Sequence, residues 1–190
     1  NKSMEFLDLG YQPLANSFIK KTNLKKKEKK YKLKICFYKT NYLVSIKNSF
    51  SSKTMFDHTY PYRSSMSKSV SKSFEDLSKK INKKFKPKNI LEIGSNDGTF
   101  LKFFEKNKIV GIEPCKNVEK ITKKKGFITY PIYWNNKSSN FLKKKFGSFD
   151  LIFSANTLSH IKNLNNVFKN IHKILSSDGV LIVEDPSLLE

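Results

Sequence analysis

The sequence has very little arginine and very little cysteine. Of its 37 basic residues only Arg63 is an arginine, and its two cysteines, Cys36 and Cys115, lie far apart in the chain. Two distant cysteines outside any Cys-x-x-Cys pair define neither a disulfide framework nor a zinc site. The chain also lacks a run of roughly 20 apolar residues that could cross a bilayer, and residues 1–5 lack the apolar core of a signal peptide. These absences predict a cytoplasmic protein without a membrane anchor.

The charge of the chain is strongly one-sided, because 37 Lys and Arg residues oppose 16 Asp and Glu residues and leave a net charge of +21. Such an excess is compatible with nucleic acid or another polyanion as partner. The scarcity of arginine argues against nucleic acid, since readers of phosphate and guanine favour the bidentate guanidinium group. Lysine runs also occur throughout the chain, as at residues 25–30, 79–88 and 143–145. We therefore favour solvated lysines over a nucleic-acid-binding surface.

Three regions of the chain differ in their pattern of apolar and charged residues. Residues 1–62 contain short apolar patches between lysine-rich connectors, which predicts a small, loop-rich module of a few short strands. Residues 63–87 predict a linker helix, because their apolar side chains recur at helical spacing: Val70, Phe74, Leu77 and Ile81. Residues 88–190 form a third region, in which strand and helix patterns alternate. The sequence thus predicts a small module, a linker helix and a larger domain.

The third region has the pattern of a parallel sheet. Apolar runs at residues 89–93, 109–112, 150–153 and 180–183 are typical of strands buried on both faces. Apolar side chains then recur at helical spacing over residues 164–175, and residues 176–179 predict a turn back to the sheet. Strands and helices in alternation predict an α/β fold with a doubly wound, Rossmann-like sheet.

Polar residues directly follow three of these strands, at the sheet edge where ligands bind in open α/β folds. Glu113 follows the second strand, about 20 residues after a glycine turn, where a carboxylate commonly holds ribose hydroxyls. Asn156 and His160 follow the third strand. The glycine turn itself lies at the end of the first strand: Glu92, Gly94, Ser95, Asn96, Asp97 and Gly98. A glycine turn alone also occurs in enzymes that bind nicotinamide or flavin cofactors, and it sometimes serves only close packing. The glycine turn together with Glu113 favours an adenosine-bearing ligand.

These motifs are similar to those of a known enzyme family. The series Glu-x-Gly-x-x-x-Gly, Gly-Ile-Glu-Pro and Asp-Leu-Ile-x-x-x-Asn resembles class I S-adenosylmethionine-dependent methyltransferases. Residues 8–16 (Asp-Leu-Gly-Tyr-Gln-Pro-Leu-Ala-Asn) and 60–67 (Tyr-Pro-Tyr-Arg-Ser-Ser-Met-Ser), with Glu-Asp-Pro at 184–186, more specifically resemble the sugar C-methyltransferases of nucleotide-linked 4-keto deoxyhexoses. The matches are collinear and span nearly the whole chain.

The resemblance implies a cofactor, a substrate class and site residues. S-adenosylmethionine would be bound by Glu92, Gly94, Ser95, Asn96, Asp97, Gly98, Glu113 and Asn156. Tyr62 (or Tyr60) and His160 would face a small-molecule nucleotide sugar. A sugar carbon becomes a nucleophile only after it loses a proton acidified by the neighbouring ketone, so the reaction needs a base and an enolate stabiliser. In the family a Tyr-x-Glu-His segment beyond the fifth strand contributes to this step, and we expect the principal base to lie outside residues 1–190.

The amino-terminal region departs from the family pattern. Family members bind a structural zinc through two Cys-x-x-Cys pairs, but Tyr38 and Asn41 stand where the second pair should be, and Cys36 is out of register. The first pair would precede Asn1. The sequence therefore predicts a degenerate zinc-binding-like module without a metal, and an internal fragment of a longer protein whose sheet stops after the fifth strand.

Two alternative functions remain open from the sequence. The first keeps S-adenosylmethionine as cofactor but makes RNA or another polyanion the methyl acceptor, in line with the charge of +21. The second is a degenerate, non-catalytic scaffold that has lost both zinc and cofactor. The favoured prediction is C-methylation of a nucleotide-linked keto deoxysugar through an enolate.

Overall fold

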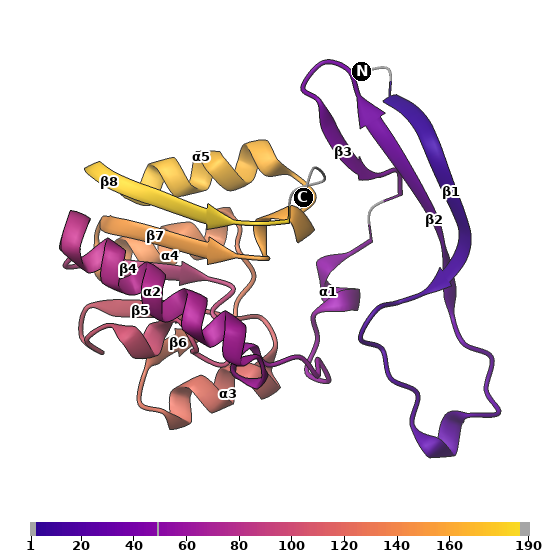
Figure 1. Cartoon of the computed structure of the whole chain (residues 1–190), viewed down its shortest axis with the longest axis horizontal. Coiled ribbons are helices and arrows are strands. Elements are labelled where there is room, and N and C mark those ends of the chain that lie inside the picture. The colour runs from indigo at the N-terminus through magenta and orange to yellow at the C-terminus, as the bar shows by residue number, and fades with distance from the viewer. Residues whose placement is uncertain (1–2, 49, 187–190) are drawn as a thin grey trace. The chain divides into compact units, whose positions relative to one another are not determined.

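The computed structural model describes residues 3–48 and 50–186, which form two compact units. Unit 1 ends at Met55, and unit 2 comprises residues Phe56–Pro186. The division falls earlier in the chain than the predicted boundary at residue 62. It assigns the predicted linker helix to unit 2. Figure 1 shows both units, which are described separately below.

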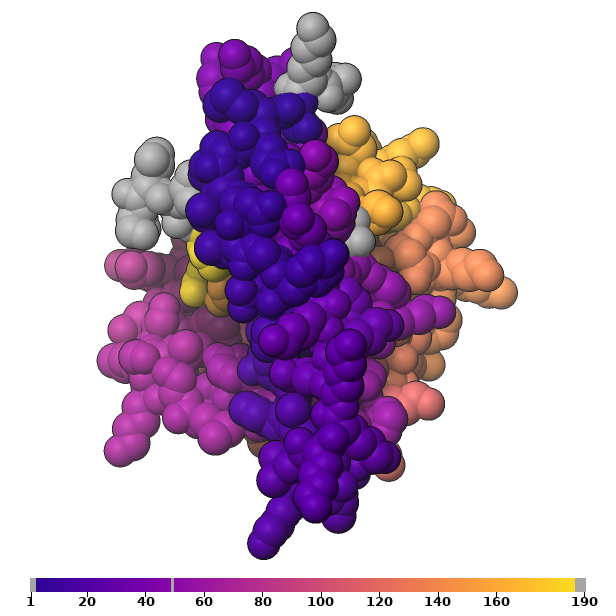
Figure 2. Space-filling view, turned by 90° about the vertical axis from the view of Figure 1, so that its right-hand side faces the viewer, coloured from indigo at the N-terminus to yellow at the C-terminus, as the bar shows by residue number. Residues whose placement is uncertain are grey.

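Unit 1 contains a small antiparallel sheet in the order β1-β2-β3: β1 (Ser3–Pro13), β2 (Lys30–Tyr38) and β3 (Leu43–Ile46). The short helices η1 (Lys21–Asn23) and α1 (Ser52–Met55) lie in its connections. The segment between β1 and β2, in indigo to purple, extends beyond one end of the strands in both views (Figures 1 and 2). The described part of unit 1 has strands and no long helix, as predicted, but β1 and β2 span 11 and 9 residues and are longer than the short strands that the sequence predicted.

Unit 2 is built on a five-stranded parallel sheet in the order β6-β5-β4-β7-β8. Its strands are β4 (Ile90–Ile93), β5 (Ile109–Ile112), β6 (Ile128–Tyr130), β7 (Phe149–Ala155) and β8 (Leu175–Glu184). The chain runs outward from β4 to β6 and then returns to the other side of β4 with β7. This reversal is the topological switch point at which open α/β sheets bind ligands. The predicted doubly wound α/β fold is confirmed.

The helical segments of unit 2 are η2 (Ser64–Met66), α2 (Lys68–Phe85), η3 (Leu101–Phe103), α3 (Lys116–Lys124), α4 (Asn136–Phe146), η4 (Leu158–His160) and α5 (Leu164–Ile174). Ser67 caps α2 by accepting a hydrogen bond from the Val70 amide at 3.3 Å. Asn135 caps α4 through a capping box, in which its side chain and that of Ser138 satisfy each other's backbone amides. No described helix is both long and apolar enough to span a membrane.

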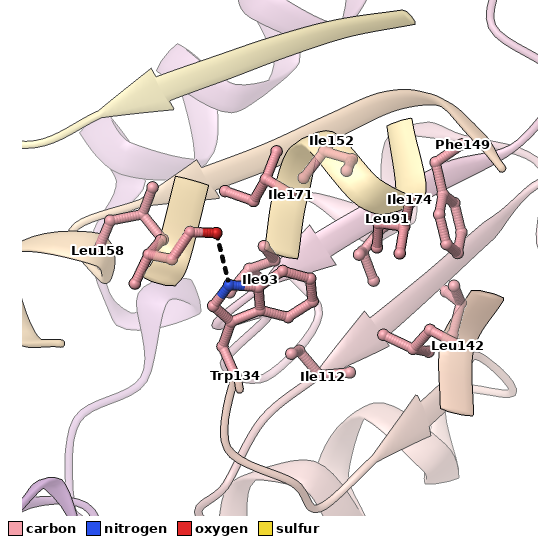
Figure 3. Close-up of a cluster of buried hydrophobic side chains, with 12 residues drawn as sticks. Leu91, Ile93, Ile112, Trp134, Leu142, Phe149, Ile152, Leu158, Ile171 and Ile174 are labelled. Carbon is pink, nitrogen blue, oxygen red and sulfur yellow. Dashed lines mark hydrogen bonds between the residues drawn. The ribbon is translucent and has the colours of Figure 1, made fainter. Parts of the chain in front are cut away.

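Two apolar cores cover the two faces of the unit 2 sheet. Ile90, Leu151 and Phe153 point toward α2, where they meet Phe74 and Ile81. Neighbouring residues of the same strands point to the opposite face, because side chains alternate along a strand. There they pack with α4 and α5 in the cluster of Figure 3, which includes Leu91, Ile93, Ile152, Leu142 and Ile171. The indole Nε1 of buried Trp134 also donates to the Val167 carbonyl at 3.4 Å (Figure 3).

β8 begins earlier than the sequence predicted. Leu175 already pairs with Phe149, and Val180 then pairs with Leu151. Over this interval β8 advances five residues while β7 advances two, so residues 176–179 form an irregularity within the ladder. The expected turn is thus absorbed into the strand.

Candidate functional site at the carboxyl ends of the strands

The loop after β4 turns off the sheet at two glycines with positive φ, Gly94 at 79° and Gly98 at 78°. A Cβ at Gly94 would lie 2.1 Å from Oγ1 of Thr157, and a Cβ at Gly98 would lie 2.9 Å from Cγ2 of Thr122. Both positions therefore need glycine for conformation and for space. The amides of Gly94 and Ser95 also donate to the Ile112 carbonyl at 2.9 and 3.0 Å, which fixes the loop to the end of β5.

Glu113 lies at the tip of β5 and joins this loop to the start of α3. Its Oε2 accepts from the Asn96 amide at 3.0 Å, and its Oε1 accepts from the Cys115 amide at 2.9 Å. Only 5% of the residue is exposed. Burial raises the pKa of Glu113, while the hydrogen bonds from Cys115 and Asn96 oppose the rise. The structure thus brings Glu113 together with the predicted cofactor loop.

Glu92, at the end of β4, is a second buried carboxyl group beside this loop. Burial raises its pKa well above the ordinary value, and the nearby Glu113 and Asp97 carboxyl groups raise it further. Its Oε2 and the Oγ of Ser95 are buried and have no hydrogen-bond partner among the described residues. Buried polar atoms normally have hydrogen-bond partners. Two such atoms without a partner next to a glycine turn therefore fit a site at which a polar ligand supplies the missing hydrogen bonds.

Asp97 is the third buried carboxyl group, and it is already satisfied. It accepts from Oγ1 of Thr99 at 2.7 Å, and Lys125 Nζ lies 3.5 Å from its Oδ2. Burial opposes ionisation, but hydrogen bonds from Ser65 and Thr99 outweigh it and lower the pKa of Asp97. Asp97 therefore stabilises the loop as a carboxylate, whereas Glu92 favours the neutral form.

Residues 60–67, the Tyr-Pro-Tyr segment of the sequence, contact the same loop. The Ser64 amide donates to Oδ1 of Asn96 at 2.9 Å, and Asn96 Nδ2 lies 3.5 Å from the Tyr62 carbonyl. Arg63 donates from its guanidinium to the carbonyls of Tyr60 and Tyr62 at 3.0 and 3.1 Å. Asn96, at φ 47°, thus connects the glycine turn to this segment.

His160 and Tyr60 both contact the ring of Phe56, each with a centroid separation of 5.3 Å. The Phe56 carbonyl accepts from the Tyr133 hydroxyl at 2.6 Å, and the Tyr60 carbonyl accepts from Asn117 Nδ2 at 2.8 Å. Burial raises the pKa of Tyr60. The Phe56 ring therefore contacts both His160 and Tyr60.

The other predicted residues lie at the same sheet edge with fewer contacts. The Asn156 amide donates to the Glu184 carbonyl at 2.6 Å, while its side chain is exposed. The Tyr62 side chain is 43% exposed. Neither side chain is in hydrogen-bond contact with Glu92 or Glu113 in the described structure. The roles of Asn156, Tyr62 and His160 stay predictions.

Sequence reasoning missed several residues that build this site. Thr157 fills the space above Gly94, and Lys125 Nζ donates to the Asp97 carbonyl at 2.6 Å. Phe56 and Tyr133 support the histidine side of the site. Arg63 was the one missed residue with a signal, because it is the only arginine of the chain. The others make long-range contacts that no local pattern indicates.

The residues of unit 1 do not fit a zinc site. Residues 1–55 contain one cysteine, Cys36, and no histidine. Cys36 is fully buried in β2. Within residues 3–48 and 50–186, no group of three or more His, Cys, Asp or Glu side chains is placed to hold a metal ion. A tetrahedral site of cysteine and histidine ligands cannot be assembled from these residues.

Comparison with known proteins identifies the family of unit 2. A family model described as "Methyltransferase domain" matches residues 62–189, two thirds of the chain, so the chain belongs to this family. The class of protein predicted from the sequence is confirmed. A second model, described as "Putative zinc binding domain", matches residues 1–56, where the zinc ligands are missing.

The chain is also similar to individual proteins. The C-methyltransferase NovU of Streptomyces niveus is 26% identical over 103 residues, which cover 53% of this chain and 24% of NovU. The plantazolicin methyltransferase BamL, solved with a triazolic desmethylPZN analogue and SAH, superposes with a TM-score of 0.50 at 20% identity over 62% of this chain and 47% of BamL. DesVI of Streptomyces venezuelae has a TM-score of 0.49 at 17% identity over 61% of this chain and 50% of DesVI. The matched region spans about a quarter of NovU and about half of each solved chain.

Proposed function

We propose that unit 2 binds S-adenosylmethionine at the ends of β4, β5 and β7, and that the protein methylates a carbon of a nucleotide-linked keto deoxysugar. One observation supports the cofactor site above all. The glycine turn is surrounded by three buried carboxyl groups, and the orphaned atoms Glu92 Oε2 and Ser95 Oγ lie beside it. Membership of the methyltransferase family supports the same ligand.

Glu113 is suited to hold the ribose of the cofactor. A carboxylate offers about four acceptor positions, and the amides of Asn96 and Cys115 occupy one on each oxygen. The remaining positions can accept the two ribose hydroxyls. Because Glu113 is 95% buried, hydrogen bonds to it are formed in a low-dielectric environment and discriminate strongly against ligands without hydroxyls.

Glu92 and the glycine turn are suited to the amino-acid end of the cofactor. Gly94 lets the chain turn sharply off β4, and a neutral Glu92 can donate or accept a hydrogen bond through its orphaned Oε2. When bound, S-adenosylmethionine supplies an electrophilic sulfonium methyl group. An acceptor would have to reach that group at the same sheet edge, where Thr157 and His160 follow β7.

The acceptor side is assigned to His160, Tyr60 and Tyr62. A nucleophilic carbon requires removal of a proton next to a ketone, and groups that hydrogen-bond the keto oxygen stabilise the enolate. The contacts of His160 and Tyr60 with the ring of Phe56 support this assignment. The similarity to NovU, named as a C-methyltransferase, supports carbon over oxygen or nitrogen as the methylated atom.

Calorimetry with S-adenosylmethionine tests the cofactor site. We expect saturable one-to-one binding to the wild-type chain. Glu113→Ala should weaken it by about tenfold or more, since a hydrogen bond to a charged group contributes roughly 1.5–3 kcal/mol. Glu105→Ala is the matched control, because Glu105 is an exposed glutamate paired with Lys108 at 2.7 Å. Equal affinities of wild type and Glu113→Ala would remove Glu113 from the site, and absence of binding by the folded wild type would refute the proposal.

A further inference from the structure

A separate cavity of about 440 Å³ lies beside α3 in unit 2. Its walls are formed by one helix face and one residue of the preceding segment: His58, Lys116, Asn117, Lys120, Ile121 and Lys124. Lys116, Lys120 and Lys124 follow one another at intervals of four, so they lie in a row along α3. The cavity contains none of the residues assigned to S-adenosylmethionine.

The three lysines of this cavity differ from other lysines of α3 and its end. Lys123 pairs with Glu119 at 2.7 Å, and Lys125 contacts Asp97. In the described part of the chain, by contrast, no carboxylate lies within 4.0 Å of Lys116, Lys120 or Lys124. No acidic residue lines the cavity either. Lys116, Lys120 and Lys124 line this concave surface largely through their aliphatic stems, and their ammonium groups, without a carboxylate partner, add a positive potential that attracts a multivalent anion.

The amino terminus of α3 strengthens this potential. Lys116 is the first residue of the helix, where the helix dipole favours negative charge. The only acidic residue of the first turn, Glu119, is 3% exposed and paired with Lys123, so it does not neutralise the cavity. Lysine is a regular phosphate ligand in proteins, acting as a point charge.

Asn117 adds a second requirement on the ligand. Its Nδ2 donates to the Tyr60 carbonyl, but its Oδ1 is buried and has no partner among the described residues. A ligand that offers a hydrogen-bond donor beside its anionic group would satisfy this oxygen. Inorganic pyrophosphate, which has no sugar hydroxyls, would engage the lysines alone.

We propose that this lysine cavity binds the diphosphate group of the nucleotide-linked acceptor. The inference rests on the proposed function, because the acceptor proposed there carries a diphosphate and sugar hydroxyls on one molecule. The hydrogen bond from Asn117 to Tyr60 joins the cavity to residues 56–60, whose Phe56 contacts His160. A diphosphate held by α3 would therefore be bound next to the segment that faces the sugar.

A small ligand fits these observations better than RNA. A volume of about 440 Å³ is within the usual range of small-molecule sites, and the row comprises lysines from a single helix. RNA recognition commonly adds several aromatic stacking platforms or arginine, whereas His58 is the one aromatic residue among those that line this cavity and none of them is an arginine. The competing explanation for anion binding is diffuse attraction by the net charge of +21. The control variant described below separates that attraction from binding in the cavity.

Titration with inorganic pyrophosphate tests the proposal. We expect saturable calorimetric binding to the wild-type chain, and a loss of about fivefold or more in affinity for Lys120→Ala, which corresponds to roughly 1 kcal/mol. Lys144→Ala is the matched control, because it removes one exposed lysine from α4 outside the cavity. Alanine preserves helix propensity at both positions, and unchanged Trp134 fluorescence verifies the fold. Orthophosphate should bind more weakly than pyrophosphate.

The possible results separate the two proposals. Affinity for S-adenosylmethionine that is unchanged in Lys120→Ala, together with weakened pyrophosphate binding, would support a distinct anion site. No saturable pyrophosphate binding, or an equal loss in Lys120→Ala and Lys144→Ala, would overturn the anion site while leaving the cofactor site intact. A single-stranded RNA could also bind. If Lys120→Ala and Lys144→Ala reduced the salt dependence of that binding equally, the lysines would form a diffuse surface for polyanions instead.

Discussion

Buried apolar side chains fill both faces of the unit 2 sheet, whereas the described residues of unit 1 bury only Cys36. β1 shows the contrast most clearly, since its apolar residues Phe6, Leu9 and Tyr11 are 51%, 45% and 66% exposed. Unit 2 has the two-layered core of a domain that folds around its own sheet. Unit 1 has the sequence match of a metal-stabilised module without the ligands of the metal.

The two units also use charge differently. In unit 1 the Glu5 carboxylate contacts Lys34 and Lys47, and the hydrogen bond from Lys34 lowers the pKa of Glu5. Such exposed pairs contribute little stability. Unit 2 instead buries Glu92 and Glu113 at its glycine turn, an arrangement that costs free energy and that the surrounding core offsets. Three of the buried carboxyl groups of unit 2 therefore lie at the candidate site, whereas Glu119 of α3 lies outside it and pairs with Lys123.

Removal of a core aromatic ring should produce the largest effect. Phe153 stacks on Phe100 with a centroid separation of 3.9 Å and is fully buried. We expect Phe153→Ala to lower the free energy of unfolding of unit 2 by about 3–5 kcal/mol. Urea titration monitored by the fluorescence of Trp134, the only tryptophan, measures this change. Phe6→Ala in unit 1, followed by far-UV circular dichroism, should change stability by less than about 1 kcal/mol, and similar losses for both variants would contradict the contrast.

Substitution of two glycines with similar backbone angles distinguishes the cost of backbone strain from the cost of a steric clash. Gly94 in unit 2 and Gly10 in unit 1 have φ of 79° and 69°, but only Gly94 would place a Cβ against another residue, Thr157. Gly10→Ala should cost about 1–2 kcal/mol, from the left-handed conformation alone. Gly94→Ala should cost more and should also abolish S-adenosylmethionine binding. Gly94→Ala combined with Thr157→Ala removes the two side-chain atoms that would lie 2.1 and 2.8 Å from the added Cβ, and failure of this pair to recover any stability would refute the steric explanation.

The buried carboxyl group of Glu92 predicts a pH-dependent difference between wild type and Glu92→Gln. Below its ordinary pKa of 4.5 the group is protonated in both the folded and unfolded states, so the two proteins should be about equally pH-sensitive. Above pH 4.5 the unfolded state releases its proton first, because burial and the nearby Glu113 and Asp97 raise the folded-state pKa. Wild-type stability should therefore fall relative to Glu92→Gln as the pH rises. Parallel curves in urea titrations between pH 4 and 8 would show that Glu92 is not held neutral.

The smallest effect is expected for the charge pairs of unit 1. Lys47 Nζ lies 3.0 Å from the Glu5 carboxylate, but half of its side chain is exposed. Lys47→Ala should change stability by less than about 0.5 kcal/mol, and the change should disappear at high salt. Amide hydrogen exchange at Cys36, in the centre of the unit 1 sheet, is the measurement. A salt-independent loss of protection would show that this pair is more than a surface contact.

The central features of the methyltransferase domain could be predicted because they are local in sequence. The strand at residues 109–112 and the helix over residues 164–174 follow directly from apolar spacing. The glycine turn and Glu113 were found because polar residues interrupt an apolar run at a sheet edge. Family resemblance then supplied the ligand, which spacing alone left open between several nucleotides.

Other elements gave too weak a signal. β6 comprises only three residues, and α4 has the sequence Asn-Lys-Ser-Ser-Asn-Phe-Leu-Lys-Lys-Lys-Phe, in which lysine and serine hide the apolar face. The contacts of Phe56 with His160 and of Ser64 with Asn96 connect residues far apart in the chain. The positive potential at the lysine cavity depends on which lysines lack a carboxylate partner in the folded structure. The composition of the chain does not show this.

The most direct test of the account is a map of the S-adenosylmethionine site by amide chemical shifts. We predict that added S-adenosylmethionine shifts the amide signals of residues 94–98 and 113–115 and leaves those of the β1–β3 sheet unchanged. Asn96 and Cys115 should respond strongly, because their amides already donate to the Glu113 carboxylate. Unchanged signals at residues 94–98 and 113–115, in a folded sample at saturating S-adenosylmethionine, would contradict the assignment of the cofactor site to unit 2.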